Sequence, residues 1–300
     1  MGSFTIMIKM KISTQLFLSL FIFCSCSQLT EFKNKTISFF QTEKETPQTI
    51  IEPKPEIKRI ENQKEKIVQE KLEQTIKIQK YCQTMQTYFD KYNWGISDCE
   101  KIPWEHVRNS YFGNPIVWTV FGSEEAHQKI PKNTTLIMCG VHGDEITPVK
   151  FCFDVIEDLK KPHHNFEDNL VIVAPLVNPD GFFRDDPTRT NARGVDPNRN
   201  FPTKDWKKSA LKEWKRRYRA NKRRYPGKRP LSEQEVHFQV NLIKRYQPNK
   251  VISVHSPLTI LDYDGPSIRD QNADDRESAA SATDLLSKMS KQAKGYKISN

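Results

Sequence analysis

The sequence has 300 residues, of which 36% are hydrophobic and 28% are charged. This length leaves room for one large domain and an extension, and excludes a chain of several large domains. The low apolar fraction indicates that part of the chain lies outside a packed core. A formal net charge of +10 suits a nucleic acid, an anionic membrane surface or an acidic substrate, so charge alone does not identify the partner.

An apolar run near the N-terminus predicts export. Residues 16–23 are almost entirely apolar, and Lys9 and Lys11 precede them. The run is shorter than the roughly 20 residues that span a bilayer and matches an export signal. Cys26 resembles the lipid-modified cysteine of bacterial lipoproteins, and a plain cleaved signal or a retained anchor are the alternatives. We therefore expect residues 1–26 to be an export signal or lipoprotein leader, which places the protein in the periplasm or on the membrane of a bacterial envelope.

A polar segment separates this leader from the compact domain. Residues 27–56 are rich in Thr, Glu, Lys and Gln and have little apolar pattern, which is typical of a tether. Residues 57–90 are charged, but apolar residues recur at near-helical spacing. We expect a long, weakly amphipathic helix there, which either serves as a spacer or packs lightly on the domain. Residues 27–93 thus form a tether and charged helix, and residues 94–300 form the domain.

Four cysteines remain after the leader. Cys82 and Cys99 lie in the polar approach to the domain, where an oxidising compartment would allow them to pair. Cys139 ends an apolar strand, and Cys152 lies among apolar residues of the following helix. For these two, buried small hydrophobic side chains are favoured over reactive thiols.

Predicted strands and helices alternate through the domain. Buried or alternating apolar runs predict strands over residues 116–122, 134–139, 170–177 and 250–254. Helical spacing predicts helices over residues 146–160, 233–245 and 276–293. This alternation indicates an α/β domain with a largely parallel sheet and its site at the strand ends.

Two histidines and a glutamate lie at predicted strand ends. His142 and Glu145 follow the strand that ends at 139, and their spacing allows an imidazole and a carboxylate to bind one ion. Taken alone, this pair is better explained as a turn with a capping carboxylate. His255 ends another strand and supplies a third ligand, as hydrolytic zinc sites require.

A polar segment between these ligands suits a substrate carboxylate. Asn198 and Arg199 place an amide beside a guanidinium, and the planar fork of Arg binds a carboxylate through two parallel hydrogen bonds. Asp196 is suited to accept the second ring N–H of a ligand histidine. A solvated polar turn is the alternative for each of these residues.

These motifs together resemble the zinc carboxypeptidase family, over about residues 94 to 300. The matching segments are His142-Gly-Asp-Glu145, Asn178-Pro-Asp-Gly181, Gly194-Val-Asp-Pro-Asn-Arg-Asn-Phe201 and the strand-end His255. The resemblance implies a mixed, largely parallel sheet with helices on both faces, and one Zn²⁺ ion. Within the family, the sequence is most similar to bacterial murein peptide amidases, which cut the γ-D-glutamyl–diaminopimelate bond. The features behind this choice are the HGDE motif, the short segment before Gly194, Pro230-Leu-Ser-Glu233 and Tyr263-Asp-Gly-Pro266.

The resemblance also implies a role for each matching residue. The metal ligands would be His142, Glu145 and His255, the substrate carboxylate would be bound by Asn198 and Arg199, and His142 would be oriented by Asp196. Arg189 would polarise the scissile carbonyl, although Arg193 competes for this role. Asp144 replaces the Arg that often precedes the ligand Glu, and an acid there suits a substrate that bears an amine, such as diaminopimelate.

One catalytic residue of the family has no counterpart in the sequence. Family members use a general-base Glu on a strand well after the third ligand, and no Glu follows Glu277. We therefore expect a C-terminally truncated domain. Two hypotheses follow: a zinc-dependent peptidase that hydrolyses murein peptides or removes a C-terminal residue, and a catalytically inactive relative that binds only zinc and peptide or cell wall.

A basic stretch follows the carboxylate motif. Residues 204–229 contain thirteen Lys and Arg side chains interleaved with Trp206, Trp214, Tyr218 and Tyr225. Such a mixture can bind nucleic acid through phosphate contacts and base stacking, but the predicted export argues against that partner. Anionic murein peptides or a membrane, reached through the leader or a lipid on Cys26, fit better, and a solvated helix is the simplest interpretation. The five remaining histidines, His163 and His164 among them, are expected to have no functional role.

Overall fold

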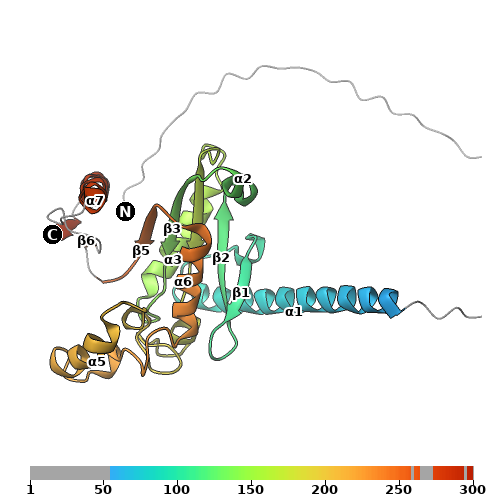
Figure 1. Ribbon diagram of the computed structural model, residues 1–300, viewed down its shortest axis with the longest axis horizontal. Coiled ribbons are helices and arrows are strands. Elements are labelled where there is room, and N and C mark those ends of the chain that lie inside the picture. Colours follow the sequence, from blue (N-terminus) through green and yellow to red (C-terminus); the bar gives the residue numbers. More distant parts are fainter. Residues whose placement is uncertain (1–54, 258–259, 264–272, 294–295, 300) are drawn as a thin grey trace, which may run out of the picture. The chain divides into compact units, whose positions relative to one another are not determined.

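The computed structural model describes residues 55–257, 260–263, 273–293 and 296–299 (Figure 1). The predicted leader (1–26), the lipidation of Cys26 and nearly all of the tether lie outside the described residues, as do the last three residues of the Tyr263-Asp-Gly-Pro266 motif. Within the described ranges, no helix is both long enough and apolar enough to cross a membrane.

A mixed five-stranded sheet forms the centre of the domain. Its order is β1-β2-β4-β3-β5, with antiparallel β1–β2 and β2–β4 pairs and parallel β3–β4 and β3–β5 pairs. The strands are β1 (Glu105–Asn109), β2 (Pro115–Phe121), β3 (Asn133–Met138), β4 (Asn169–Ala174) and β5 (Lys250–Ser253). The predicted α/β class with a mixed sheet is confirmed, and its parallel half, β4-β3-β5, carries the strand ends of interest.

Helices and short helical turns connect the strands. The α-helices are α1 (Pro55–Lys91), α2 (Glu124–Lys129), α3 (Ile146–Leu159), α4 (Pro179–Phe182), α5 (Trp206–Arg216), α6 (Gln234–Tyr246) and α7 (Ala273–Ala293). The 3₁₀ turns are η1 (Cys99–Lys101), η2 (Pro197–Arg199) and η3 (Lys222–Arg224). A separate parallel pair joins β6 (Ile260–Asp262) to β7 (Lys297–Ser299).

Two hydrophobic cores cover the two faces of the sheet. Alternate residues of β3 and β4, such as Leu136 and Ile172, pack with Phe238 and Leu242 of α6. The opposite face, which includes Val173, packs with α3 and with the end of α1. Because successive side chains of a strand point to opposite faces, one apolar strand serves both cores. Burial on both faces holds the end of β3 in a fixed position, and β5 is held beside it by parallel pairing although its residues are partly exposed.

The long helix predicted over residues 57–90 is confirmed as α1, and it packs more firmly at its C-terminal end than predicted. Tyr81, Met85 and Phe89 are buried in the core, whereas Ile67 and Leu72 are exposed. The three buried side chains are four residues apart and therefore share one face of the helix. Helical spacing alone shows which face is apolar, but not how far the core extends along it.

Both pairs of cysteines form disulfides. The predicted Cys82–Cys99 bridge is present and joins α1 to η1. Cys139 and Cys152 are fully buried as predicted, but their interpretation as unpaired small side chains is wrong, because they also form a disulfide. This bridge connects the residue after β3 to α3, and so closes the segment that contains His142 and Glu145. A loop of this size adds about 3 kcal/mol by restricting the unfolded chain.

Candidate metal centre

The three predicted ligands lie at one edge of the parallel half of the sheet. His142 follows β3, Glu145 is the residue before the first turn of α3, and His255 follows β5. Met138 of β3 pairs with Ser253 of β5, so the two strands end side by side. The N-terminal end of a helix also favours a negative charge, which suits Glu145.

The ligand atoms of these residues converge. Nδ1 of His142 lies 2.8 Å from Oε1 of Glu145, and Nδ1 of His255 lies 2.7 Å from Oε2 of the same carboxylate. One ligand atom from each residue lies within 4.8 Å of the other two. Two imidazole nitrogens and one carboxylate are a donor set that zinc accepts in hydrolytic sites. The residues therefore fit the predicted ion.

Asp196 lies behind His142, where an orienting partner is expected. Its Oδ1 is 3.1 Å from Nε2 of His142, and its side chain is fully buried. A carboxylate here accepts the Nε2 proton and turns Nδ1 toward the ion. Burial alone would raise the pKa of Asp196, but the hydrogen bond from His142 and the charges of His142 and Arg189 lower it. Asp196 is therefore an anion suited to this contact.

The electrostatic environment of the centre favours positive charge. Burial alone would lower the pKa of His142, yet hydrogen bonds to Asp196 and Glu145 raise it. Burial would also raise the pKa of Glu145, but hydrogen bonds from His142 and His255 lower that pKa to about 2. Two anions thus surround His142 in the absence of an ion, which is the environment that a divalent cation requires.

Two close backbone contacts explain the glycines of the motifs. A Cβ on Gly143 would lie 2.1 Å from the carbonyl carbon of Gly181, and a Cβ on Gly181 would lie 2.8 Å from the carbonyl oxygens of Thr188 and Thr190. The loop with His142 therefore packs directly on the Asn178–Gly181 turn, and that turn packs on the segment with Arg189. Only glycine permits these approaches.

The two candidate arginines have different surroundings. Arg189 donates from Nη1 to Oε1 of Glu145 at 3.1 Å and from Nε to Oδ2 of Asp196 at 2.9 Å. Arg193 is half exposed, and its guanidinium lies 3.6 Å from Glu233. Arg189 is thus the arginine beside the ligands, and Arg193 belongs to a neighbouring cluster.

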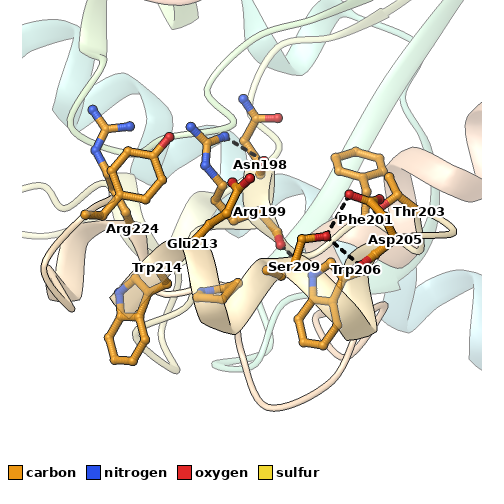
Figure 2. Close-up of a pocket in the computed structure, with 13 residues that line it drawn as sticks. Asn198, Arg199, Phe201, Thr203, Asp205, Trp206, Ser209, Glu213, Trp214 and Arg224 are labelled. Atoms are coloured by element: carbon orange, nitrogen blue, oxygen red, sulfur yellow. Dashed lines mark hydrogen bonds between the residues drawn. The ribbon is translucent and has the colours of Figure 1, made fainter. Parts of the chain in front are cut away.

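Asn198 and Arg199 lie in η2 and line a pocket of ≈ 180 Å³ (Figure 2). The backbone of Arg199 is held by Trp206, whose indole N–H donates to its carbonyl oxygen at 2.8 Å. The next residue, Asn200, is buried and donates from Nδ2 to the carbonyl oxygens of Pro226 and Arg229. Asp196 Oδ1 also accepts from the backbone N–H of Asn198, which links this motif to His142.

Asp144 forms an ion pair that the sequence did not predict. It forms an ion pair with Arg223 of η3, while its Oδ1 is buried with no hydrogen-bond partner among the described residues. The proposed role of Asp144 as the partner of a substrate amine stays a prediction, in competition with Arg223.

A buried acidic pair behind the site was also missed from the sequence. Asn191 donates from Nδ2 to Glu233 at 2.8 Å and to Glu235 at 2.9 Å, and all three side chains are buried. Asn191 lies in the segment between Arg189 and Asp196, so this contact supports the site from behind. No spacing rule joins residues more than 40 positions apart, and the Pro230–Glu233 motif was the only signal.

Comparison with known proteins supports the family resemblance. The sequence profile of the family described as zinc carboxypeptidase matches residues 96–299. Murein peptide amidase A of Escherichia coli K12 is 34% identical over 168 residues, which cover 53% of this chain and 61% of the relative. Murein peptide amidase A of Vibrio campbellii is 30% identical over 129 residues, which cover 42% of this chain and 49% of that protein. The chain thus spans about half to three fifths of the length of these relatives.

Solved structures share the fold at lower identity. Bovine thrombin-activatable fibrinolysis inhibitor, in complex with a tick carboxypeptidase inhibitor, is 21% identical, with a TM-score of 0.51 and 75% of each chain covered. Carboxypeptidase A of Helicoverpa armigera is 17% identical, with the same TM-score of 0.51, and the match covers 65% of this chain and 52% of the other. These likenesses show the fold alone.

Proposed function

The chain belongs to the zinc carboxypeptidase family, and on that premise we propose that it is a zinc-dependent peptidase of the cell envelope. Its proposed substrates are murein peptides, cut at the γ-D-glutamyl–diaminopimelate bond, or other peptides that lose a C-terminal residue. The observation that carries the proposal is the convergence of two imidazole Nδ1 atoms on the carboxylate of Glu145. Zinc bound there polarises a carbonyl and lowers the pKa of water toward about 7.

The residues around the ligands have separate tasks in this proposal. Asp196 orients His142 through Nε2, so that Nδ1 faces the centre. Arg189 places a guanidinium beside Glu145, where the oxygen of a scissile carbonyl would gain negative charge. Asn198 and Arg199 would hold the substrate carboxylate, because both line the adjacent pocket and Arg199 is half-buried there.

The similarity to murein peptide amidases supports the choice of substrate, and the expected leader supports an envelope location. A murein peptide of this kind carries a free carboxylate, which matches Asn198 and Arg199. The two disulfides are also compatible with an oxidising compartment.

A second candidate function is zinc and peptide binding without turnover. Among the described residues, the carboxylates that contact the ligand histidines are those of Glu145 and Asp196. Both already have a task, as a ligand and as an orienting partner, so neither is available as a general base. This observation favours the binding hypothesis for the chain as described.

One experiment separates the two functions. The zinc content of the purified chain would be measured together with diaminopimelate release from L-Ala-γ-D-Glu-meso-diaminopimelate. The peptidase proposal predicts about one zinc per chain and release that is lost in Glu145→Gln. Zinc without release would support the binding function, and a chain without zinc would contradict both. Glu157→Gln, an exposed change on the same helix, is the matched control.

A further inference from the structure

The pocket lined by Asn198 and Arg199 contains two arginines that form no ion pair with a carboxylate of the described residues. The guanidinium carbon of Arg199 lies 5.8 Å from the ring centroid of Tyr218, and that of Arg224 lies 4.9 Å from the same centroid. No carboxylate of the described residues lies within ion-pair distance of either side chain. Arg217 lies 5.5 Å from the same centroid, so three cations surround this ring, and Arg199 and Arg224 are the two that line the pocket.

The shape of the pocket arranges these groups together. Figure 2 shows the guanidinium groups of Arg199 and Arg224 on the same side of the pocket as the amide of Asn198, with the indoles of Trp206 and Trp214 on the other side. The carboxylate of Glu213 also lines the pocket and has no ion-pair partner among the described residues. The remaining acidic lining residue, Asp205, accepts a hydrogen bond from Ser209. The charges of the lining without an ion-pair partner among the described residues are therefore two guanidinium groups and two carboxylates, and of the two carboxylates that of Glu213 is the one without the Ser209 contact.

Arg224 belongs to the turn η3, whose backbone is fixed by neighbouring residues. Asn221 caps the turn η3, and its side-chain oxygen accepts a hydrogen bond from the backbone N–H of Arg223. Arg223 then forms the ion pair with Asp144, next to the ligand Glu145. The same turn thus anchors one arginine at the metal centre and presents the next one to the pocket.

We propose that this pocket selects a leaving residue whose side chain ends in a second amino-acid head group. Arg199 takes the carboxylate beside the scissile bond, which rests on the proposed function, Arg224 takes the distal carboxylate, and Glu213 takes the distal ammonium group. Two carboxylates and one ammonium group complement the charges of Arg199, Arg224 and Glu213. Arg224 and Glu213 are then specificity residues outside the family motifs.

The test uses the zinc-loaded full chain and three peptides with one shared acyl part. They end in diaminopimelate, in 2-aminopimelate, which lacks the distal ammonium group, or in lysine, which lacks the distal carboxylate. Binding is followed by tryptophan fluorescence, because Trp206 and Trp214 line the pocket. Arg224→Gln should weaken the diaminopimelate and 2-aminopimelate peptides about tenfold and leave the lysine peptide unchanged. Arg224→Lys should fall between wild type and Gln.

Glu213→Gln should weaken the diaminopimelate and lysine peptides a few-fold and spare the 2-aminopimelate peptide. Lys222→Gln removes an exposed charge from the same turn and should change none of the three affinities. Thermal unfolding of each variant checks that the fold is intact. Equal weakening of all three peptides by Arg224→Gln, or no weakening, would overturn the proposal. Hydrolysis is scored separately, so preserved selectivity without cleavage would contradict the peptidase proposal and leave the pocket assignment standing.

Discussion

Two pairs of carboxylates contact the segment that carries Arg189 and Asn191, and their surroundings shift carboxylate pKa values in opposite directions. Glu145 and Asp196 contact histidines and a guanidinium, which hold both pKa values low. Glu235, beside Glu233, is contacted by the neutral amide of Asn191, and burial raises its pKa to about 7. Burial alone favours the neutral acid in both places, so the polar partners decide whether the pKa of a buried carboxylate is lowered, as for Glu145 and Asp196, or raised, as for Glu235.

This difference in pKa explains why the first pair, and not the second, is suited to a metal ion. An ionised carboxylate between two imidazoles offers ligand atoms to a cation, whereas Glu235 is half-protonated near neutral pH and has an oxygen with no hydrogen-bond partner among the described residues. The second pair instead holds Asn191, and through it the segment that carries Arg189 and Asp196.

The largest expected effect is on zinc affinity, when the charge of Glu145 is removed. Glu145→Gln replaces the carboxylate between His142 and His255 with a neutral amide of the same shape. We expect zinc affinity to fall by more than about 100-fold, the upper end of the loss seen for an outer partner of a ligand. Calorimetric titration with zinc measures it, and wild-type affinity in this variant would remove Glu145 from the ligand set.

The next largest effect is expected on kcat, when the arginine beside each pair of carboxylates is replaced in turn. Arg189 contacts Glu145 and Asp196, whereas Arg193 lies beside Glu233. If the chain is a peptidase, Arg189→Gln should lower kcat about 100-fold, as the loss of one donor to a developing oxyanion does. Arg193→Gln is the matched control and should leave kcat within about twofold. The reverse ranking would assign the role to Arg193.

The smallest expected effect concerns stability. The folded-state pKa of Glu235 is raised above its ordinary value of 4.5 to about 7, so the stability it contributes is complete below the ordinary value and is lost as the pH rises through the folded one. The free energy of unfolding should fall by roughly 2 kcal/mol between about pH 5 and 7.5. Urea unfolding across this range measures the fall, and Glu235→Gln should remove it. An identical pH profile in the variant would contradict the assignment.

The sequence was most informative where chemistry depends on strand ends. His142 and His255 each follow an apolar run, and parallel strands bring such ends to one edge of a sheet. The motif with Asn198 and Arg199 was likewise visible, because its residues are adjacent. Local spacing thus predicted the α/β class, which is confirmed, and a His-Glu-His group that the structure brings together, whereas the carboxylate role of Asn198 and Arg199 stays a prediction.

Contacts between distant loops could not be predicted in this way. The ion pair of Asp144 with Arg223 spans 79 positions and depends on the path of the basic segment. The bridge from Cys139 to Cys152 depends on how α3 returns over β3, which residue types alone do not show. Both contacts depend on geometry that emerges only when the segments pack.

A second group of possible ligands, formed by Asp158, His163 and His164, sharpens the final test. These residues are largely exposed, whereas His142 is 1% exposed. Anomalous X-ray diffraction at the zinc absorption edge, from crystals of the zinc-loaded chain, locates the ion directly. One peak among His142 Nδ1, His255 Nδ1 and the Glu145 carboxylate is the predicted result. No peak there, or a peak only at the exposed group, would contradict the proposed centre.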